Sequence, residues 1–362
     1  MNKDMNDKKA GLIKKTPGYV MTMIVLLILL ILSVLLAVTF GSVRIPFRDV
    51  YGVILYQLFG IGDASVYGSG KIYDVVCFIR LPRLMLSMAV GMGLAVCGVI
   101  MQAVVKNPLA EPYTLGISSG ASLGATVAIL LGVGARFGSN YVGVMAFLGA
   151  FGISIAVVAL ANIGGRATSV KLLLGGMALS SVCSSFSSFV VYFSSDNDAL
   201  KNVTFWLMGS FAGASWENIA VVFPIVVLAL LFFWSQYRNL NLMLLGDETA
   251  ITLGTDLHRL RQVYLLVSAA VVGFVVYSSG TIGFVGLIIP HLVRMVFGTD
   301  HKKILPICAL IGAIFLIWAD VLCRIILPGM ELPVGLLTSM IGAPCFIYLM
   351  VRKRYGFGGG DS

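Results

Sequence analysis

Charged side chains are scarce in this sequence. Lys, Arg, Asp and Glu make up 11% of its 362 residues, whereas hydrophobic residues make up 59%. Soluble domains contain roughly 25% charged residues, so the composition excludes an ordinary soluble protein. A charge at the centre of a bilayer costs about 2.5 to 3.5 kcal/mol on insertion scales, which is why membrane segments contain few of them.

Residues that hold metals or build active sites are also few. The six cysteines form no CxxC pair, and the three histidines, His258, His291 and His301, are widely dispersed. The cysteines are therefore interpreted as small apolar residues, and no GxSxG nucleophile motif is present. We expect no catalytic residue, no metal site and no cofactor in this chain.

Only Gly68–Lys71 resembles a phosphate-binding loop, but Ser65 stands where that loop needs Gly and Ile72 where it needs Ser or Thr. Nucleotide binding by this device is excluded. The net charge of +9 is explained by basic residues that meet anionic lipid headgroups. A nucleic-acid partner has no support.

Long apolar runs, in contrast, fill most of the chain. A bilayer core about 30 Å thick needs about 20 apolar residues per helix, and a helix satisfies its own backbone amides in lipid. The sequence therefore predicts an all-α polytopic membrane protein with about ten transmembrane helices. The expected spans are residues 20–40, 82–105, 112–132, 140–163, 169–193, 216–236, 260–279, 282–297, 303–327 and 333–351.

The flanks of these spans predict their orientation. If the N-terminus is cytoplasmic, the inner loops and tails hold roughly twice as many Lys and Arg as the outer ones, as the positive-inside rule requires. Both termini are therefore expected in the cytoplasm. Residues 1–19 and 352–362 would be tails, and residues 20–351 a single transmembrane domain of the cell membrane.

Small residues recur on two of the expected spans. Gly116, Gly120 and Gly124 follow the helix-breaking run 107–112, and this ladder predicts close helix packing there. Ser180, Ser184 and Ser188 share one helical face. Such hydroxyls either let helices approach closely or line a wet path, and both interpretations stay open.

The charged residues near spans are the most informative. Asp320 and Arg324 lie four apart on one helical face, where they can form an ion pair. Arg80 and Arg83 fall on the same expected outer surface as Arg324. The three arginines either serve local pairing or form a docking patch for carboxylates of an external partner.

The longest inner loop, residues 237–260, contains a short helical pattern from Glu248 to Leu253 between two glycines. It is either a surface connector or a docking helix for an intracellular motor. The residues proposed for such docking are Gly246, Asp247, Glu248, Ala250, Leu253 and Gly254.

Several ordered motifs resemble one family. They are Arg80-Leu81-Pro82-Arg83, Asn107-Pro108-Leu109-Ala110-Glu111-Pro112, Gly283-Phe284-Val285-Gly286 through Pro290-His291-Leu292-Val293-Arg294, Ala319-Asp320 and Glu331-Leu332-Pro333-Val334-Gly335. Together, over roughly residues 20–355, they resemble the permease subunits of ABC importers for iron-siderophores, haem and cobalamin. The run Glu248-Thr249-Ala250 with Gly254 is similar to the importer coupling signature, although Thr249 replaces an alanine.

The resemblance implies a ten-helix permease that works with a second permease copy or a similar chain, two cytoplasmic ATPase subunits and an extracytoplasmic substrate-binding protein. It also implies that Arg80, Arg83 and Arg324 receive acidic residues of the binding protein, and that ATP hydrolysis occurs in the partner subunits.

The favoured cargo is a ferric siderophore, with haem and cobalamin as alternatives. A secondary transporter is a rival interpretation, but Asp320 is its only clear intramembrane acid. A membrane-embedded enzyme lacks clustered His, Asp and Ser residues.

Overall fold

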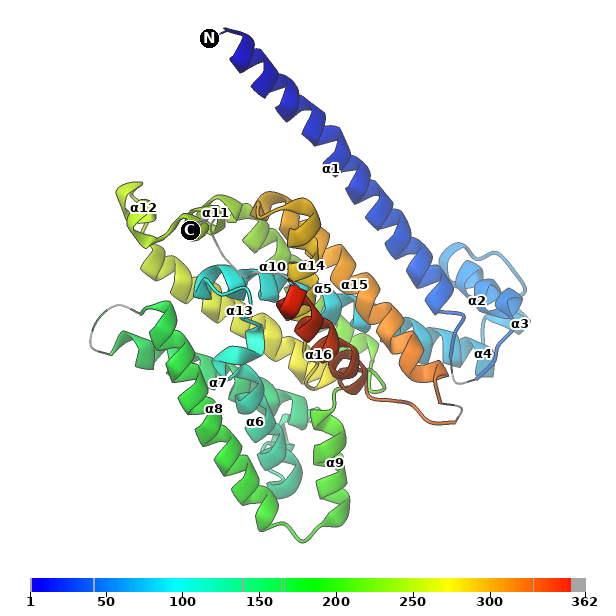
Figure 1. Ribbon diagram of the computed structural model, residues 1–362. Coiled ribbons are helices and arrows are strands. Elements are labelled where there is room, and N and C mark those ends of the chain that lie inside the picture. Colours follow the sequence, from blue (N-terminus) through cyan, green and yellow to red (C-terminus); the bar gives the residue numbers. More distant parts are fainter. Residues whose placement is uncertain are drawn as a thin grey trace.

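The computed structural model describes residues 2–41, 43–138, 140–163, 165, 167–327 and 329–352. All regular elements in these residues are helical (Figure 1). The long helices are α1 (Asn2–Ala37), α5 (Leu81–Val105), α7 (Tyr141–Asn162), α8 (Ser169–Tyr192), α10 (Trp216–Ser235), α13 (Leu257–Ser279) and α15 (His301–Ile325). Each contains a segment long and apolar enough to cross a membrane.

Shorter elements complete the described bundle. Three of them are apolar, namely α6 (Ile117–Leu131), α14 (Val285–Phe297) and α16 (Val334–Arg352). The others are α2 (Phe47–Phe59), α3 (Ala64–Tyr67), α4 (Lys71–Asp74), η1 (Val75–Arg80), η2 (Pro112–Leu115), η3 (Ala135–Phe137), α9 (Asn197–Leu207), α11 (Tyr237–Leu245) and α12 (Asp247–Thr252). Every expected span falls on one long or short apolar helix, so the all-α polytopic class is confirmed. The number of crossings and the side on which the termini lie stay predictions.

Two expected spans match helices but differ from the structure at their N-terminal ends. The span expected to begin at residue 82 is part of a continuous helical stretch from Lys71 to Val105. The π-helix η1 leads directly into Pro82, with Leu81 N donating to Val76 O, so the helix continues although proline cannot donate a backbone hydrogen bond.

The span expected at 112–132 is interrupted. A short 3-10 turn, η2, ends at Gly116, whose φ of 84° is in the left-handed region that favours glycine. The helix proper, α6, starts only at Ile117 and has 15 residues. Because about 20 residues are needed to cross the hydrocarbon core, α6 alone is short for a full crossing.

Helix α5 forms the centre of the bundle and is almost wholly buried. It packs against α10, α13, α14 and α15. A Cβ on Gly91 would collide with the backbone of Gly312 in α15, and one on Gly98 with the backbone of Gly286 in α14. Glycine at these positions lets the backbones touch, which is the usual way in which helices associate within lipid.

Helix α1 lies at the edge of the bundle and projects beyond it in Figure 1. It packs along α15, where Trp318 Nε1 donates to Ser33 Oγ at 3.0 Å. Much of its remaining apolar surface between residues 20 and 36 is exposed. Such an apolar, uncharged face is suited to contact with lipid.

Candidate functional sites

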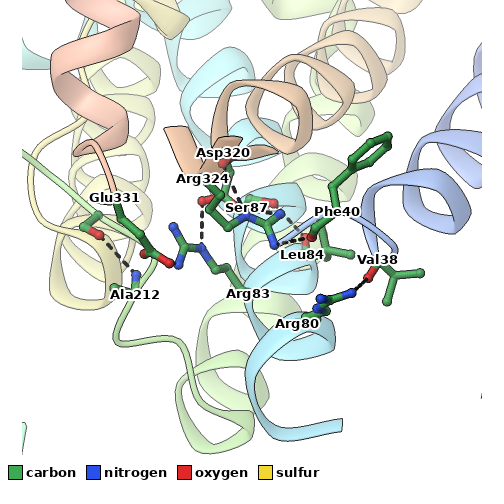
Figure 2. A network of polar contacts seen from close by, with 11 residues as sticks. Val38, Phe40, Arg80, Arg83, Leu84, Ser87, Ala212, Asp320, Arg324 and Glu331 are labelled. Atoms are coloured by element: carbon green, nitrogen blue, oxygen red, sulfur yellow. Dashed lines mark hydrogen bonds and ion pairs between the residues drawn. The ribbon is translucent and has the colours of Figure 1, made fainter. Parts of the chain in front are cut away.

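Arg83, in the first turn of α5, is held by two carboxylates from the far end of the sequence. Its Nε donates to Asp320 Oδ1 at 2.8 Å and its Nη1 to Glu331 Oε2 at 2.7 Å. Arg324, one turn after Asp320 on α15, places Nη2 3.0 Å from Asp320 Oδ2. Asp320 therefore bridges two arginines from two helices (Figure 2), and the expected pairing with Arg324 is present.

Arg80 and Arg324 donate hydrogen bonds to backbone carbonyls just after the end of α1. Arg80 Nη1 donates to the carbonyls of Val38 and Thr39 at 2.9 and 3.0 Å, and Arg324 Nη1 donates to that of Phe40 at 3.0 Å. Carbonyls at the C-terminal end of a helix carry partial negative charge and attract cations. The arginines thus fasten α1 to the α5–α15 pair.

The three arginines are buried, whereas the sequence interpretation placed them on an outer surface. Arg80, Arg83 and Arg324 are 2%, 4% and 5% exposed. A guanidinium tolerates burial when carboxylates and carbonyls take up its donors, and that pairing was visible in the sequence only for Asp320 and Arg324. The structure does bring all three together beside the residues that follow α1 (Figure 2). We call Arg80, Arg83 and Arg324, with the carboxylates of Asp320 and Glu331, the arginine cluster.

Glu331 is a site residue that the sequence reasoning did not single out. It precedes α16 and its side chain is 37% exposed, so it lies over Arg83 as the accessible part of the cluster. Arg83 Nη2 is buried without a hydrogen-bond partner among the described residues. The only sequence signal for Glu331 was its place in the Glu331-Leu332-Pro333 motif.

The short helix expected from Glu248 is present as α12, and it begins one residue earlier, at Asp247. Gly246, with φ of 104°, separates it from α11, and Gly254, with φ of 78°, follows its end. Both glycines adopt backbone conformations that other residues rarely take. They let the chain turn sharply at either end of α12.

The side chains in and just after α12 differ in their exposure. Ala250 is fully buried, and Leu253, just beyond the helix, is 61% exposed. The side chains of Asp247 and Glu248 lie outside the described residues. In Figure 1, α12 and α11 lie at the end of the bundle opposite α2, α3 and α4.

The glycine ladder lies against α7 and α8. A Cβ on Gly120 would collide with the Gly149 carbonyl and one on Gly124 with that of Met145, both in α7. One on Gly116 would lie 3.0 Å from Ser180 Oγ in α8.

The serine face of α8 has two environments. Ser180 is partly buried against Gly116, whereas Ser184 and Ser188 are exposed. Ser188 lines a cavity of about 400 Å³ between α6, α8 and α9, together with Ser122 and Thr126. The contact of Ser180 with Gly116 is typical of close helix packing. The position of Ser188 beside a cavity is typical of a residue that lines a wet path.

Glu111, just before η2, reaches the unwound segment between α13 and α14. Its Oε2 accepts a hydrogen bond from Phe284 N at 3.3 Å, and nearby Tyr113 OH accepts one from Ile282 N at 3.4 Å. Burial raises the pKa of the Glu111 carboxyl above its usual range, while the bond from Phe284 lowers it. Phe284 is a non-glycine residue with a positive φ of 67°. The hydrogen bond from its N–H to Glu111 helps to hold the backbone in that conformation.

Comparison with known proteins covers nearly the whole chain. The profile of the FecCD transport family matches residues 28–352. The chain is 38% identical over 333 residues to the hemin transport system permease protein HmuU of Yersinia pestis, covering 91% of this chain and 95% of that protein. It is 39% identical over 275 residues to the vitamin B12 import system permease protein BtuC of Salmonella typhi, covering 76% and 83%.

A solved structure agrees with this match. It is described as an inward-facing conformation of an ABC transporter of the metal-chelate type, and it is 31% identical in sequence with a TM-score of 0.77. The alignment covers 92% of this chain and 99% of that one.

Proposed function

The chain belongs to the FecCD transport family and is an ABC importer permease of the cell membrane, and on that premise we propose that its cargo is a ferric siderophore. The match along residues 28–352 supports the permease function. The similar structure of metal-chelate type supports a chelate as cargo. Haem and cobalamin remain the alternative cargoes, since HmuU and BtuC are named for hemin and vitamin B12.

The test of cargo uses the whole transporter. The chain would be reconstituted in proteoliposomes with its partner ATPase and binding protein, and ATP-driven uptake of a ferric siderophore, haem and cobalamin would be measured. Saturable uptake of the siderophore alone is expected. If only haem or only cobalamin is taken up, that compound is the cargo and the siderophore proposal is wrong. Uptake that persists without the ATPase would contradict the importer mechanism.

We assign docking of the binding protein to the arginine cluster. Glu331 occupies Arg83 Nη1, while the neighbouring Nη2 has no hydrogen-bond partner in the part of the chain that the structure describes. A carboxylate that displaces the half-exposed Glu331 could contact both nitrogens at once, and such two-pronged Arg–carboxylate pairs are among the strongest polar contacts. Asp320 would remain beneath, holding the guanidinium in place.

We assign attachment of the ATPase to α12 and its flanking glycines. Movement of the ATPase would be passed to Gly246, Ala250 and Gly254, and the exposed Leu253 provides an apolar contact. ATP hydrolysis would occur in the partner, and this chain would supply no chemistry. A Gly254→Val variant, which strains a positive-φ position that has open space around it, is expected to assemble yet lose ATP-dependent uptake.

The transport path would lie where two permease copies, or this chain and a similar one, meet. The serine face of α8 and its adjoining cavity of about 400 Å³ support a place on that path for Ser184 and Ser188. A secondary transporter gains no support, because Asp320, its candidate ion-binding acid, is already paired with Arg83 and Arg324.

A further inference from the structure

The first turn of α15 forms hydrogen bonds with the segment that leads into α12. Asn241, in α11, accepts hydrogen bonds at its Oδ1 from His301 N at 2.9 Å and from His301 Nδ1 at 2.8 Å. Its Nδ2 donates to Asp300 Oδ1 at 3.0 Å. Because an amide oxygen can only accept, the His301 ring carries a proton on Nδ1. One side chain thus uses both of its polar groups on the start of one helix.

A second contact joins the first turn of α15 to the end of α10, just before α11. Pro306 lies inside α15 and has no N–H, so the carbonyl four residues earlier, that of Lys302, loses its usual helical donor. Trp234, near the end of α10, donates its Nε1 to that carbonyl at 3.1 Å. The sequence of α15 therefore leaves an acceptor open at the point where α10 passes.

Helix α11, which carries Asn241 and follows Trp234, is firmly packed. Leu240 and Met243 are fully buried, and α11 packs against both α5 and α15. Only Gly246 then separates α11 from α12. Helix α12 contacts α11, so a displacement of α12 would act through α11 on the Asn241 contacts with α15. The Trp234 contact lies just before α11, near the end of α10.

The opposite end of α15 carries the arginine cluster. With 25 residues the helix is about 37 Å long, and it ends with Asp320, which is fully buried, and Arg324. Its middle is pressed against α5 at Gly312. Helix α15 thus joins the arginine cluster to the contacts with Asn241 and Trp234. Coupling between two sites requires an element whose equilibrium both sites bias, and α15 is placed to be that element.

We infer that Asn241 and Trp234 are positioning residues that transmit movement between α12 and α15, so that docking at the arginine cluster changes the activity of the attached ATPase. This inference rests on the proposed docking and coupling functions. It assigns to these two side chains a mechanical role and no contact with cargo or ATP.

The experiment compares variants of the full transporter in lipid nanodiscs. Asn241→Asp removes the donor to Asp300 and places two carboxylates together. Trp234→Phe removes the N–H that donates to Lys302 O, together with part of the ring of a side chain that is 43% exposed. Both are expected to assemble with the ATPase and keep basal ATP hydrolysis within about twofold. The increase in hydrolysis on adding cargo-loaded binding protein should fall at least about fivefold, equivalent to about 1 kcal/mol of coupling.

Controls separate transmission from folding. Asn239→Asp makes the same chemical change two residues earlier in α11, where the side chain donates to Gln236 instead of α15, and should keep full stimulation. The exchange Asn241→Asp with Asp300→Asn restores a donor–acceptor pair and should recover stimulation. Should Asn241→Asp fail to assemble, Trp234→Phe decides alone.

Full stimulation in Asn241→Asp and Trp234→Phe would overturn the inference. Gly254→Val, measured in parallel, identifies which claim has failed. If Gly254→Val loses stimulation and the other two keep it, the inference fails and the coupling role of α12 stands. If all three keep it, the coupling role fails as well.

Discussion

Two helix pairs in this protein use the same packing device. In α5 and α15, Gly91 and Gly312 face each other, and in α6 and α7, Gly120 and Gly149 do so. At each of these glycines a Cβ would collide with the carbonyl of its counterpart. Backbone contact of this kind replaces the hydrophobic driving force, which is absent between helices in lipid.

The pairs differ in what accompanies that contact. The α5–α15 pair is also joined by the buried ion pair between Arg83 and Asp320. Between α6 and α7 the described residues show no side-chain hydrogen bond or ion pair. Charge fixes the register of the first pair, because sliding would leave buried charges unpaired, whereas shape alone holds the second.

Asp320→Ala should produce the largest effect. It leaves Arg83 and Arg324 without the carboxylate they share, and breaking a buried pair typically costs about 3 to 5 kcal/mol. Thermal unfolding in detergent should show a large loss of stability. Asp198→Ala is the control, since Asp198 pairs with Lys201 at an exposed position and should change little. If the two variants unfold at the same temperature, the buried ion pair does not stabilise the α5–α15 pair, and charge does not distinguish it from the α6–α7 pair.

Gly149→Ala tests the pair that shape alone holds. The added methyl meets the Gly120 backbone, and overpacking of this kind costs about 1 to 3 kcal/mol. The control is Gly152→Ala, three residues later on α7, where a Cβ would meet nothing within 4 Å. Thermal unfolding should separate the two variants, and a Gly149→Ala protein as stable as the control would contradict the close contact.

Glu331→Gln sharpens the distinction between the buried and the accessible parts of the arginine cluster. The neutral side chain competes less well for Arg83 Nη1, so an incoming carboxylate should bind more readily. Affinity for the binding protein, measured by biolayer interferometry on nanodiscs, should rise about fivefold, which corresponds to about 1 kcal/mol. Stability should fall by less than about 1 kcal/mol, as for other partly exposed ion pairs. Weaker binding would contradict competition by Glu331.

Features that depend on local pattern could be predicted from the sequence. Apolar length located the helices, and the two flanking glycines located α12 to within one residue. The i, i+4 spacing of Asp320 and Arg324 predicted their ion pair. Each of these signals lies within a single segment, where helix geometry fixes which residues are neighbours.

Features that depend on contacts between distant segments could not be predicted. Arg83 meets Asp320 and Glu331 across more than 230 positions of sequence, and no spacing rule connects them. The burial of Arg80 depends on hydrogen bonds to carbonyls that follow α1. The hydrogen bonds between Asn241 and His301 depend on how α11 packs against α15. A single sequence specifies these pairings only through the folded bundle.

Glu111→Gln is expected to have the smallest effect, at a polar contact that joins the α6 side of the molecule to α14. Burial raises the pKa of Glu111 in the fold, so its stabilising contribution is complete below the unfolded pKa of about 4.3 and is lost as pH rises through the folded value. Glutamine can still accept from Phe284 N without burying a charge. The variant should therefore melt slightly higher than the parent at pH 8, with the difference shrinking toward pH 4. A variant that melts lower at pH 8 would mean that the ionised carboxylate itself holds the start of α14, and the α6 side would then also be fixed to the bundle by charge.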